Sequence, residues 1–254
     1  LFTAVTLAVM LLCICVGSVM LPPMDTLEVL WNGLTGAQGP VNEMAANIIL
    51  PVRLPSVLCV ALVGASLSLC GGAMQGLLQN PLADGTTLGV SSGASLGAVT
   101  AIAFGISLPG FPFAGSMVMA VRFAFGSLAL ILSLAYKLDS SLSTNTIILI
   151  GVIFSMFASS ISSLIITFAG DKIKTITFWT MGSLQGSSYE NALVLLAALA
   201  LFGGLVIGCG RELNAFAGGE DHARNIGVNV RRGKLTVLIC ISVRIGVCVS
   251  GSGT

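Results

Sequence analysis

The fold is decided by residues 57–106, which read VLCVALVGASLSLCGGAMQGLLQNPLADGTTLGVSSGASLGAVTAIAFGI. Two apolar runs, 57–78 and 88–106, flank a polar segment. The hydrocarbon core of a bilayer is ~30 Å thick, and a helix of about 20 apolar residues crosses it. Each run is therefore long enough to span a membrane. Asn80-Pro81 and Asp84-Gly85 favour turns, so the segment between the runs is predicted to be a tight hairpin.

Small residues recur at every fourth position in both runs. These stripes are Gly64, Ser68 and Gly72 in the first run and Gly89, Gly93 and Gly97 in the second. Lipid chains are as apolar as leucine, so membrane helices associate by close backbone approach across small residues. Each stripe alone indicates generic helix packing. Together they predict a crowded bundle of several helices.

The composition extends this interpretation to the whole chain. Of 254 residues, 55% are hydrophobic and 8% are charged, and the mean hydropathy is +1.01. Soluble domains carry about 25% charged residues. The surface must therefore be solvated by lipid, and we expect an all-α, polytopic bundle of transmembrane helices. No basic stripe with interleaved aromatic residues is present, so nucleic-acid binding has no support.

Seven segments are apolar enough to be candidate spans, and the last two are the shortest. They are Leu1–Leu21, Val57–Leu78, Leu88–Ile106, Phe113–Tyr136, Ile147–Phe168, Ala192–Gly208 and Leu235–Ser250. Between the first two, the segment Pro22–Pro55 contains a predicted amphipathic interface helix. We expect Asp25 to cap its N-terminus and Gly33 or Gly36 to end it.

The positive charges are distributed unevenly between the two sides that seven spans define. One side carries Lys137, Arg211, Arg224, Arg231, Arg232 and Lys234, and the other carries Arg53, Lys172 and Lys174. Cytoplasmic loops are enriched in Lys and Arg. The side of the 211–234 segment is therefore predicted to be cytoplasmic, together with the N-terminus.

The chemistry that the sequence lacks narrows the function. All ten acidic residues fall between the spans, so no intramembrane carboxylate is available as a proton relay. A sodium site built from backbone carbonyls remains open. The sequence has no Walker motif, no nucleophile elbow and no zinc-protease motif, and its seven cysteines read as apolar filler. We expect no catalytic residue, metal or cofactor, and energy supplied from outside the membrane.

Two positions stand out from this apolar background. Arg244 lies deep in the last span and needs a partner or an aqueous cavity. The segment Arg211–Lys234 reads as two short helices around Gly218-Gly219, with Gly227 ending the second. It is either a docking element or an ordinary solvated loop.

At these motifs the sequence resembles the FecCD family, the permeases of ABC importers for ferric siderophores, haem and cobalamin. The matching motifs are RLP (53–55), GASL (64–67), MQG (74–76), QNPLAD (79–84), LGVSSGA (88–94), FWTMGSL (178–184), RELN (211–214) and GEDHARNIGV (219–228). In combination they are specific, and they cover nearly the whole chain.

The resemblance implies a ten-helix permease that works as a dimer, with an identical or homologous second half. An ATP-binding cassette ATPase subunit would lie beneath each half, and an extracytoplasmic solute-binding protein would deliver the solute. The residues implied to couple to the ATPase are Gly218, Gly219, Glu220, Asp221, Ala223, Arg224 and Gly227.

The resemblance also implies roles elsewhere in the chain. Arg53 matches an arginine that docks the binding protein, although Ser56 stands where the family often has a second arginine. The implied cytoplasmic gate comprises Ser143, Thr144 and Asn145, and the implied pathway lining comprises Ser155, Ser159 and Ser162. The family continues for three more helices, so we expect residues 1–254 to form a single permease domain that is incomplete at its C-terminus.

The function that follows is that of a permease subunit in a bacterial cytoplasmic (inner) membrane. It would translocate an iron chelate, haem or a cobalamin-type nutrient, with ATP hydrolysed by the partner subunit. The alternative is a secondary transporter or channel driven by an ion gradient. An intramembrane enzyme lacks any nucleophile–base or metal constellation in the sequence.

Overall fold

The computed structural model describes residues 1–36, 42–84, 88–106, 114–140 and 142–252. All regular elements in these ranges are helices, as the composition predicts. Gly85 of the predicted hairpin and Phe113 of the fourth predicted span lie outside the described residues. The contacts divide the chain into two compact units, Leu1–Gly64 with Leu184–Leu196 and Ala65–Ser183 with Ala197–Thr254. They are called unit 1 and unit 2 below.

All seven predicted spans coincide with apolar helices, but their lengths differ from the prediction. Within the described residues, five helices are long enough to cross a membrane: Glu43–Leu78, Gly115–Leu138, Thr144–Phe168, Tyr189–Gly208 and Val230–Gly251. Phe2–Cys15 and Val90–Ala103 are shorter. The last two predicted spans are short, but the helices there have 20 and 22 residues, because polar residues at their starts, such as Glu190 and Lys234, continue the helix beyond the apolar run.

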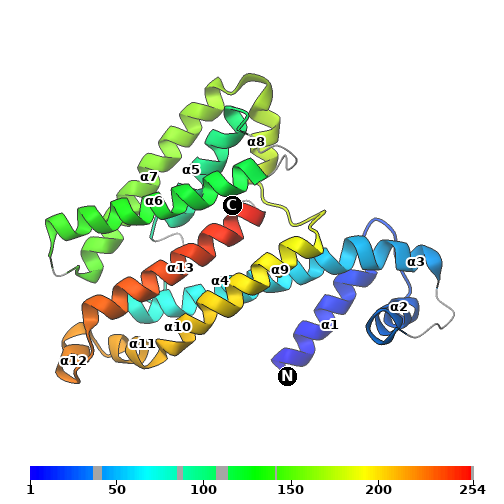
Figure 1. Ribbon diagram of the computed structural model, residues 1–254, viewed down its shortest axis with the longest axis horizontal. Coiled ribbons are helices and arrows are strands. Elements are labelled where there is room, and N and C mark those ends of the chain that lie inside the picture. The colour runs from blue at the N-terminus through cyan, green and yellow to red at the C-terminus, as the bar shows by residue number, and fades with distance from the viewer. Residues whose placement is uncertain (37–41, 85–87, 107–113, 141, 253–254) are drawn as a thin grey trace. The chain divides into compact units, whose positions relative to one another are not determined.

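Unit 1 is built from the first helices of the chain (Figure 1). They are α1 (Phe2–Cys15), α2 (Pro23–Thr35), α3 (Glu43–Ile48), the π-helical turn Ile49–Arg53 and the start of α4 (Leu54–Leu78). Pro51 lies inside the π-helical turn and has no N–H to donate, which explains the irregular ladder there. The Tyr189 hydroxyl donates to the Leu50 carbonyl at 2.5 Å, which ties α9 (Tyr189–Ala198) to this turn.

Helix α2 is amphipathic, as predicted, but its start differs from the prediction. Pro22 is the N-cap and Asp25 lies in the first turn, because Pro23 is suited to the first helical position. Gly36 ends the helix with φ +69°, one of the two predicted endings. Val29 is buried, whereas Trp31 is exposed. The exposed apolar face fits a helix lying at a membrane interface.

Unit 2 contains the larger core. It is formed by the end of α4 with α5 (Val90–Ala103), α6 (Ala114–Leu138), α7 (Thr144–Phe168) and α13 (Val230–Ser252). The connecting elements are the 3₁₀ turn Gly170–Lys172, α8 (Ile173–Thr180), the π-helical turn Leu199–Gly203, α10 (Gly204–Gly208), α11 (Gly210–Ala217) and α12 (Glu220–Asn225). Of the α13 span, 72% is buried, against 22–28% in the other long spans. Helix α13 is therefore the central helix of unit 2.

The two small-residue stripes have different surroundings. Gly93 and Gly97 face α6, where an added Cβ would lie 2.5 Å from the Ser127 Oγ and 2.7 Å from the Phe123 Cβ. Gly89 is equally crowded, because an added Cβ there would lie 2.8 Å from the Gly151 carbonyl oxygen. This second stripe is a helix-packing surface within the chain.

The first stripe requires a correction. Gly64, Ser68 and Gly72 are exposed, and an added Cβ on either glycine meets no atom within 4 Å among the described residues. Neighbouring positions such as Cys70 and Met74 face the core instead. The packing role predicted for this stripe has no partner in the described part of the chain.

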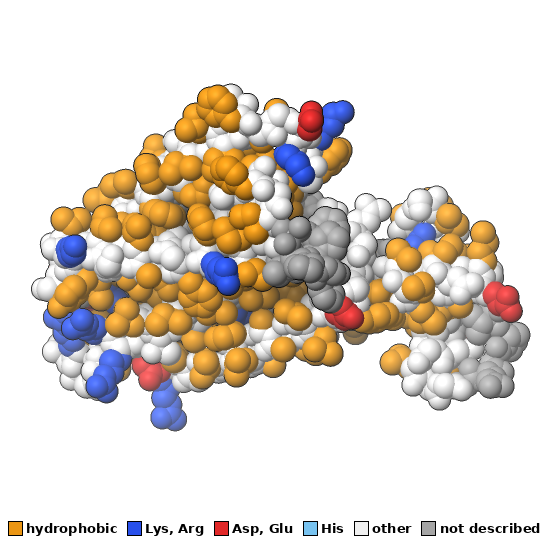
Figure 2. All heavy atoms as spheres, turned by 45° about the horizontal axis from the view of Figure 1, so that its top comes forward, with side chains coloured by type: hydrophobic (Ala, Val, Ile, Leu, Met, Phe, Trp, Pro, Cys, Tyr) orange, Lys and Arg blue, Asp and Glu red, His pale blue; other side chains and the backbone are white. Residues whose placement is uncertain are grey.

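On the face that Figure 2 shows, hydrophobic side chains cover much of the described surface, and charged side chains occupy only a few places. Large apolar residues such as Leu149, Ile153 and Phe157 on α7 point outward. An outward-facing apolar surface on this scale is the arrangement that lipid solvates. The chain is a multi-pass membrane protein.

Candidate functional site

The 211–227 segment folds as the two predicted short helices. Helix α11 ends at Gly218, and the Gly219 N–H donates to the Phe216 carbonyl at 2.9 Å. Gly219 has φ +110°, a conformation that L side chains rarely adopt. The chain can therefore reverse direction here and begin α12 directly at Glu220.

Helix α12 ends in a hydrogen-bonded glycine turn. Gly227 has φ +84°, its N–H donates to the Arg224 carbonyl, and the Val228 N–H donates to the Ala223 carbonyl, both at 3.0 Å. This pair of bonds is a Schellman motif. Beneath the helices, Phe216 and Ala223 are fully buried. The segment is compact and fixed at both ends; residues 211–227 are called the coupling loop below.

The predicted gate residues lie in the turn that starts α7. Leu142 is buried and has φ +55°, which is uncommon for a residue with a branched side chain. Ser143 is the N-cap residue of α7. Its N–H donates to the Asp139 carboxylate at 3.1 Å, and its hydroxyl lies 2.8 Å from the Thr146 hydroxyl. Residues 142–145 are called the gate turn below.

Lys234, in the first turns of α13, joins the coupling loop to the gate turn. Its ammonium group donates to the Leu142 carbonyl at 3.0 Å, to the Thr144 hydroxyl at 3.4 Å and to the Glu220 carboxylate, with which it forms an ion pair. Thr144 also donates to Glu220 at 2.9 Å. An ammonium group has three donors, and all three are used.

The environment of Glu220 favours its ionised form. Burial raises the pKa of the Glu220 carboxyl, but hydrogen bonds from Lys234 and Thr144 and the charge of Lys234 outweigh that effect. The pKa therefore lies below its ordinary value. At neutral pH Glu220 is therefore a carboxylate, and the side chain of Lys234 beside it is only 2% exposed.

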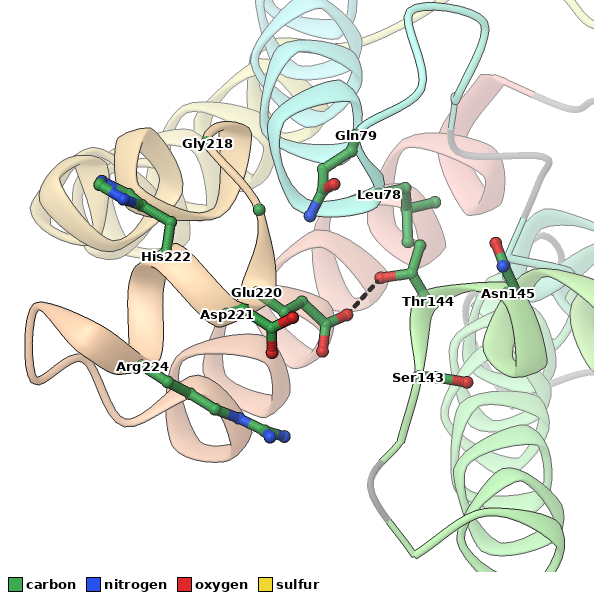
Figure 3. Close-up of a pocket in the computed structure, with 11 residues that line it drawn as sticks. Leu78, Gln79, Ser143, Thr144, Asn145, Gly218, Glu220, Asp221, His222 and Arg224 are labelled. Carbon is green, nitrogen blue, oxygen red and sulfur yellow. Dashed lines mark hydrogen bonds between the residues drawn. The ribbon is translucent and has the colours of Figure 1, made fainter.

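A cavity of about 730 Å³ opens beside this cluster (Figure 3). It is lined by Leu78, Gln79, Ser143, Thr144, Asn145, Gly218, Gly219, Glu220, Asp221, His222 and Arg224. Thr144 and Glu220 both line it and are joined directly by the hydrogen bond that is dashed in Figure 3. The cavity therefore brings most of the predicted coupling residues together with the predicted gate residues; Ala223, which is buried, and Gly227 do not line it.

Most of the cations of unit 2 belong to this same end, namely Lys137, Arg211, Arg224, Arg231, Arg232 and Lys234. Arg231 lies over the Tyr136 ring at 5.0 Å, next to Lys137 at the end of α6. Lys172 and Lys174 follow the opposite end of α7. The structure thus places the larger basic group and the coupling loop together, as the charge count predicts.

Arg53 lies in unit 1, and its guanidinium forms hydrogen bonds with backbone carbonyls of the same unit. Its Nη1 donates to the carbonyl oxygens of Ile14 and Cys15, at 2.6 and 2.9 Å, and its Nη2 donates to the Val19 carbonyl. Gly17 leaves room for this, because a Cβ there would lie 2.9 Å from the guanidinium. The arginine predicted to dock a binding protein is used to hold the end of α1.

The predicted pathway serines lie along α7. Ser155 and Ser162 bond back to their own helix, donating to the Gly151 and Ala158 carbonyls at 2.9 Å. Ser159 is exposed. Back-bonded hydroxyls are compatible with either lipid or a water-filled pathway, so the lining role stays a prediction.

Sequence reasoning missed Lys234 as a site residue and counted it only among the cytoplasmic cations. The sequence did contain a signal, because Lys234 directly precedes the apolar run 235–250. A lysine that is buried at the start of such a run must find hydrogen-bond acceptors. Its partners, the Leu142 carbonyl and Glu220, are 92 and 14 residues away. Spacing alone could not identify them.

The comparisons with known proteins agree with this architecture. The FecCD transport family matches residues 5–254. An uncharacterised ABC transporter permease protein of Bacillus subtilis is 40% identical over the whole chain and 71% of its own length. A cobalamin import system permease of Halobacterium salinarum is 33% identical over 88% of this chain and 60% of its own length.

A solved structure shares the fold as well. It is described as an inward-facing conformation of an ABC transporter assigned to the metal-chelate type, with a TM-score of 0.82 and 27% identity over 99% of this chain and 74% of that one. The chain belongs to the FecCD transport family. It is therefore related to ABC importer permeases, and a secondary transporter or channel is not favoured.

Proposed function

We propose that this chain is the membrane-spanning permease subunit of an ABC importer in a bacterial cytoplasmic membrane. Its solute is an iron chelate, haem or a cobalamin-type nutrient, and a separate ATPase subunit supplies the energy. Family membership supports the class of protein, and the cobalamin and metal-chelate relatives support the class of solute. The ten acidic residues lie at helix ends or between the long helices, which is consistent with an external energy source.

The coupling loop is the element on which the ATPase acts, and the gate turn controls the cytoplasmic opening. The observation that carries this assignment is the hydrogen bond from Thr144 to Glu220, which joins the two elements directly. Because hydrogen-bonded turns hold Gly219 and Gly227, the loop can move as one rigid body when the ATPase moves. A second permease half completes the pathway, with Ser155, Ser159 and Ser162 of α7 lining it.

An extracytoplasmic binding protein docks on the outer side of the membrane. Arg53 contributes to that surface indirectly, because its guanidinium holds the end of α1 through three carbonyl oxygens. The chain spans 60% and 71% of the length of the two curated relatives, so transport is assigned to the complete permease assembled with its partners.

The test is a Gly219→Val substitution in the complete importer reconstituted in proteoliposomes. Gly219 has φ +110°, so a branched side chain distorts the hinge. We expect uptake of the transported solute, identified from a panel of a ferric siderophore, haemin and cobalamin, to fall about tenfold or more per ATP hydrolysed, corresponding to about 1.4 kcal/mol of lost coupling.

Gly210→Ala is the matched control. It lies in the adjoining helix, where an added Cβ meets nothing within 4 Å, and uptake per ATP should be unchanged. Unchanged coupling in Gly219→Val contradicts the assignment of the loop. Uptake driven by an ion gradient in vesicles that contain only the permease contradicts the ATP-driven function itself.

A further inference from the structure

One buried cation, Lys234, connects three separate segments of unit 2. Its own helix, α13, forms the centre of the bundle, and its acceptors belong to the gate turn and to α12 of the coupling loop. The side chain is only 2% exposed, so water cannot replace a lost acceptor without the cluster opening. The position of the ammonium group therefore depends on both the gate turn and the coupling loop.

The geometry makes separate movement of the two elements costly. If the coupling loop moves and the gate turn stays, Lys234 loses the Glu220 carboxylate while it remains bonded to the Leu142 carbonyl. If the gate turn moves alone, the ammonium keeps the carboxylate and loses both of its other acceptors. A buried charge that loses a partner is strongly disfavoured, so the arrangement favours movement of both elements together with the first turns of α13, which carry Lys234.

The gate turn also has a conformation that can change. The Leu142 carbonyl is presented to Lys234 by a leucine with φ +55°. Such a conformation persists when its surroundings hold it, and here the bond from Lys234 is one of the contacts that do so. Release of this bond would allow the turn, and with it the first residues of α7, to relax.

We propose that Lys234 and Glu220 form a charged link that transmits movement of the coupling loop to the gate turn. The inference rests on the proposed function, because that function assigns the roles of loop and gate. Lys234 is a positioning residue in this scheme: it contacts neither the solute nor ATP. The alternative is a static structural contact, which would stabilise the bundle without transmitting anything.

The experiment measures the gate directly and needs no solute. Asn145 is exposed in the gate turn and lines the cavity, so an Asn145→Cys reporter can be alkylated by a maleimide. The complete permease is assembled with its ATPase in nanodiscs. Labelling at position 145 is quantified by peptide mass spectrometry, without nucleotide and with ATP plus vanadate, while ATP hydrolysis is measured in parallel.

Three variants of the reporter protein are compared with their parent. Lys234→Met removes the charge but keeps a long side chain, and Glu220→Gln removes the opposite charge while its amide oxygen still accepts from Thr144. Arg232→Met is the matched control, because it removes an exposed cation two residues away on the same helix. Thermal stability of each assembled complex is recorded so that a folding defect is recognised.

We expect nucleotide to change the labelling rate about fivefold or more in the parent and in Arg232→Met. In Lys234→Met and Glu220→Gln the change should fall below about twofold, with ATP hydrolysis retained; a fivefold change corresponds to about 1 kcal/mol. A full nucleotide response in both variants overturns the link and leaves the proposed function intact. A parent that shows no response overturns the gate and loop assignments, and the link with them.

If Lys234→Met does not assemble, Glu220→Gln decides the outcome, since Glu220 is partly exposed and its substitution is nearly isosteric. Loss of stability in both variants with the nucleotide response preserved identifies a static structural contact and overturns the proposal.

Discussion

The guanidinium of Arg53 caps the carboxyl end of α1, with Nη1 donating to the Cys15 carbonyl oxygen at 2.9 Å. The last four carbonyls of a helix have no partner within it. Ile14 and Cys15 are two of these residues in α1, and a single arginine satisfies both of their carbonyls. A residue that looks like an exposed docking arginine in the sequence is thus a helix cap in the structure.

Arg53→Gln should therefore destabilise the protein and not only weaken docking. A hydrogen bond to a charged group contributes about 1.5–3 kcal/mol, so a loss of about 2 kcal/mol or more is expected. Thermal unfolding in detergent and limited proteolysis near residues 16–20 measure it. Lys174→Gln, at an exposed cation of unit 2, is the control and should have no effect. Unaltered stability with weaker binding-protein affinity would instead favour a docking role for Arg53.

The contact between α5 and α6 predicts that replacing two different glycines by alanine has very different effects on stability. In Gly97→Ala the new Cβ would lie 2.7 Å from the Phe123 Cβ and even closer to the Met119 carbonyl oxygen. Overpacking of this kind costs about 1–3 kcal/mol. Gly126→Ala, on α6, adds a Cβ in open space and should be neutral or slightly stabilising. Thermal unfolding of both variants measures the difference, and equal stability would show that the helices can separate freely.

Gly72→Ala and Gly64→Ala test the exposed stripe on α4. Neither substitution meets an atom within 4 Å in the described residues, so the stability of the isolated chain should be unchanged or slightly raised. If a second permease half packs on this stripe, the same substitutions reduce assembly of the complex. Size-exclusion chromatography with light scattering separates the two results, and unchanged assembly would mean that the stripe faces lipid.

These glycines show how far the sequence could predict the fold. The repeat of small residues is the same in 64–72 and in 89–97, and the composition correctly predicts a helical membrane bundle. What differs is the neighbour: α6 lies against Gly93 and Gly97, whereas no described element lies against Gly64. The partner of a stripe is a property of the tertiary arrangement, and local pattern does not contain it.

In the candidate site too, the local structure could be predicted from the sequence, whereas the tertiary partners could not. The two short helices and the turns at Gly219 and Gly227 follow from local rules, because glycine conformations and helix ends are encoded within a few residues. The link through Lys234 depends on the Leu142 carbonyl, a backbone atom that any residue would offer. Its availability arises from the left-handed conformation of Leu142, which the sequence gives no reason to expect.

The charge of Glu220 predicts a pH dependence for the coupling loop. Because the pKa of its carboxyl is lowered, the ionised form contributes stability above the ordinary value of 4.5, and this contribution is lost as the pH falls through the lowered pKa. Hydrogen exchange of the 218–227 backbone should be steady from pH 7 to about pH 5 after correction for the intrinsic rate, and increase at lower pH. In Glu220→Gln that increase should be absent; an equal increase would assign the effect to another acid.

Arg244 presents the strongest conflict between sequence and surroundings. It is 1% exposed near the middle of α13, and neither its Nε nor its two Nη atoms has a hydrogen-bond partner among the described residues. Within this chain, an unpaired buried charge opposes folding, so Arg244→Met should raise the free energy of unfolding by about 1–4 kcal/mol. Thermal unfolding of the chain alone and of the assembled importer measures this. Arg232→Met, which removes an exposed cation from the same helix, is the control and should leave stability unchanged. A loss of stability confined to the assembled importer would mean that Arg244 finds its acceptor on a partner subunit, and a loss in the chain alone would contradict the prediction.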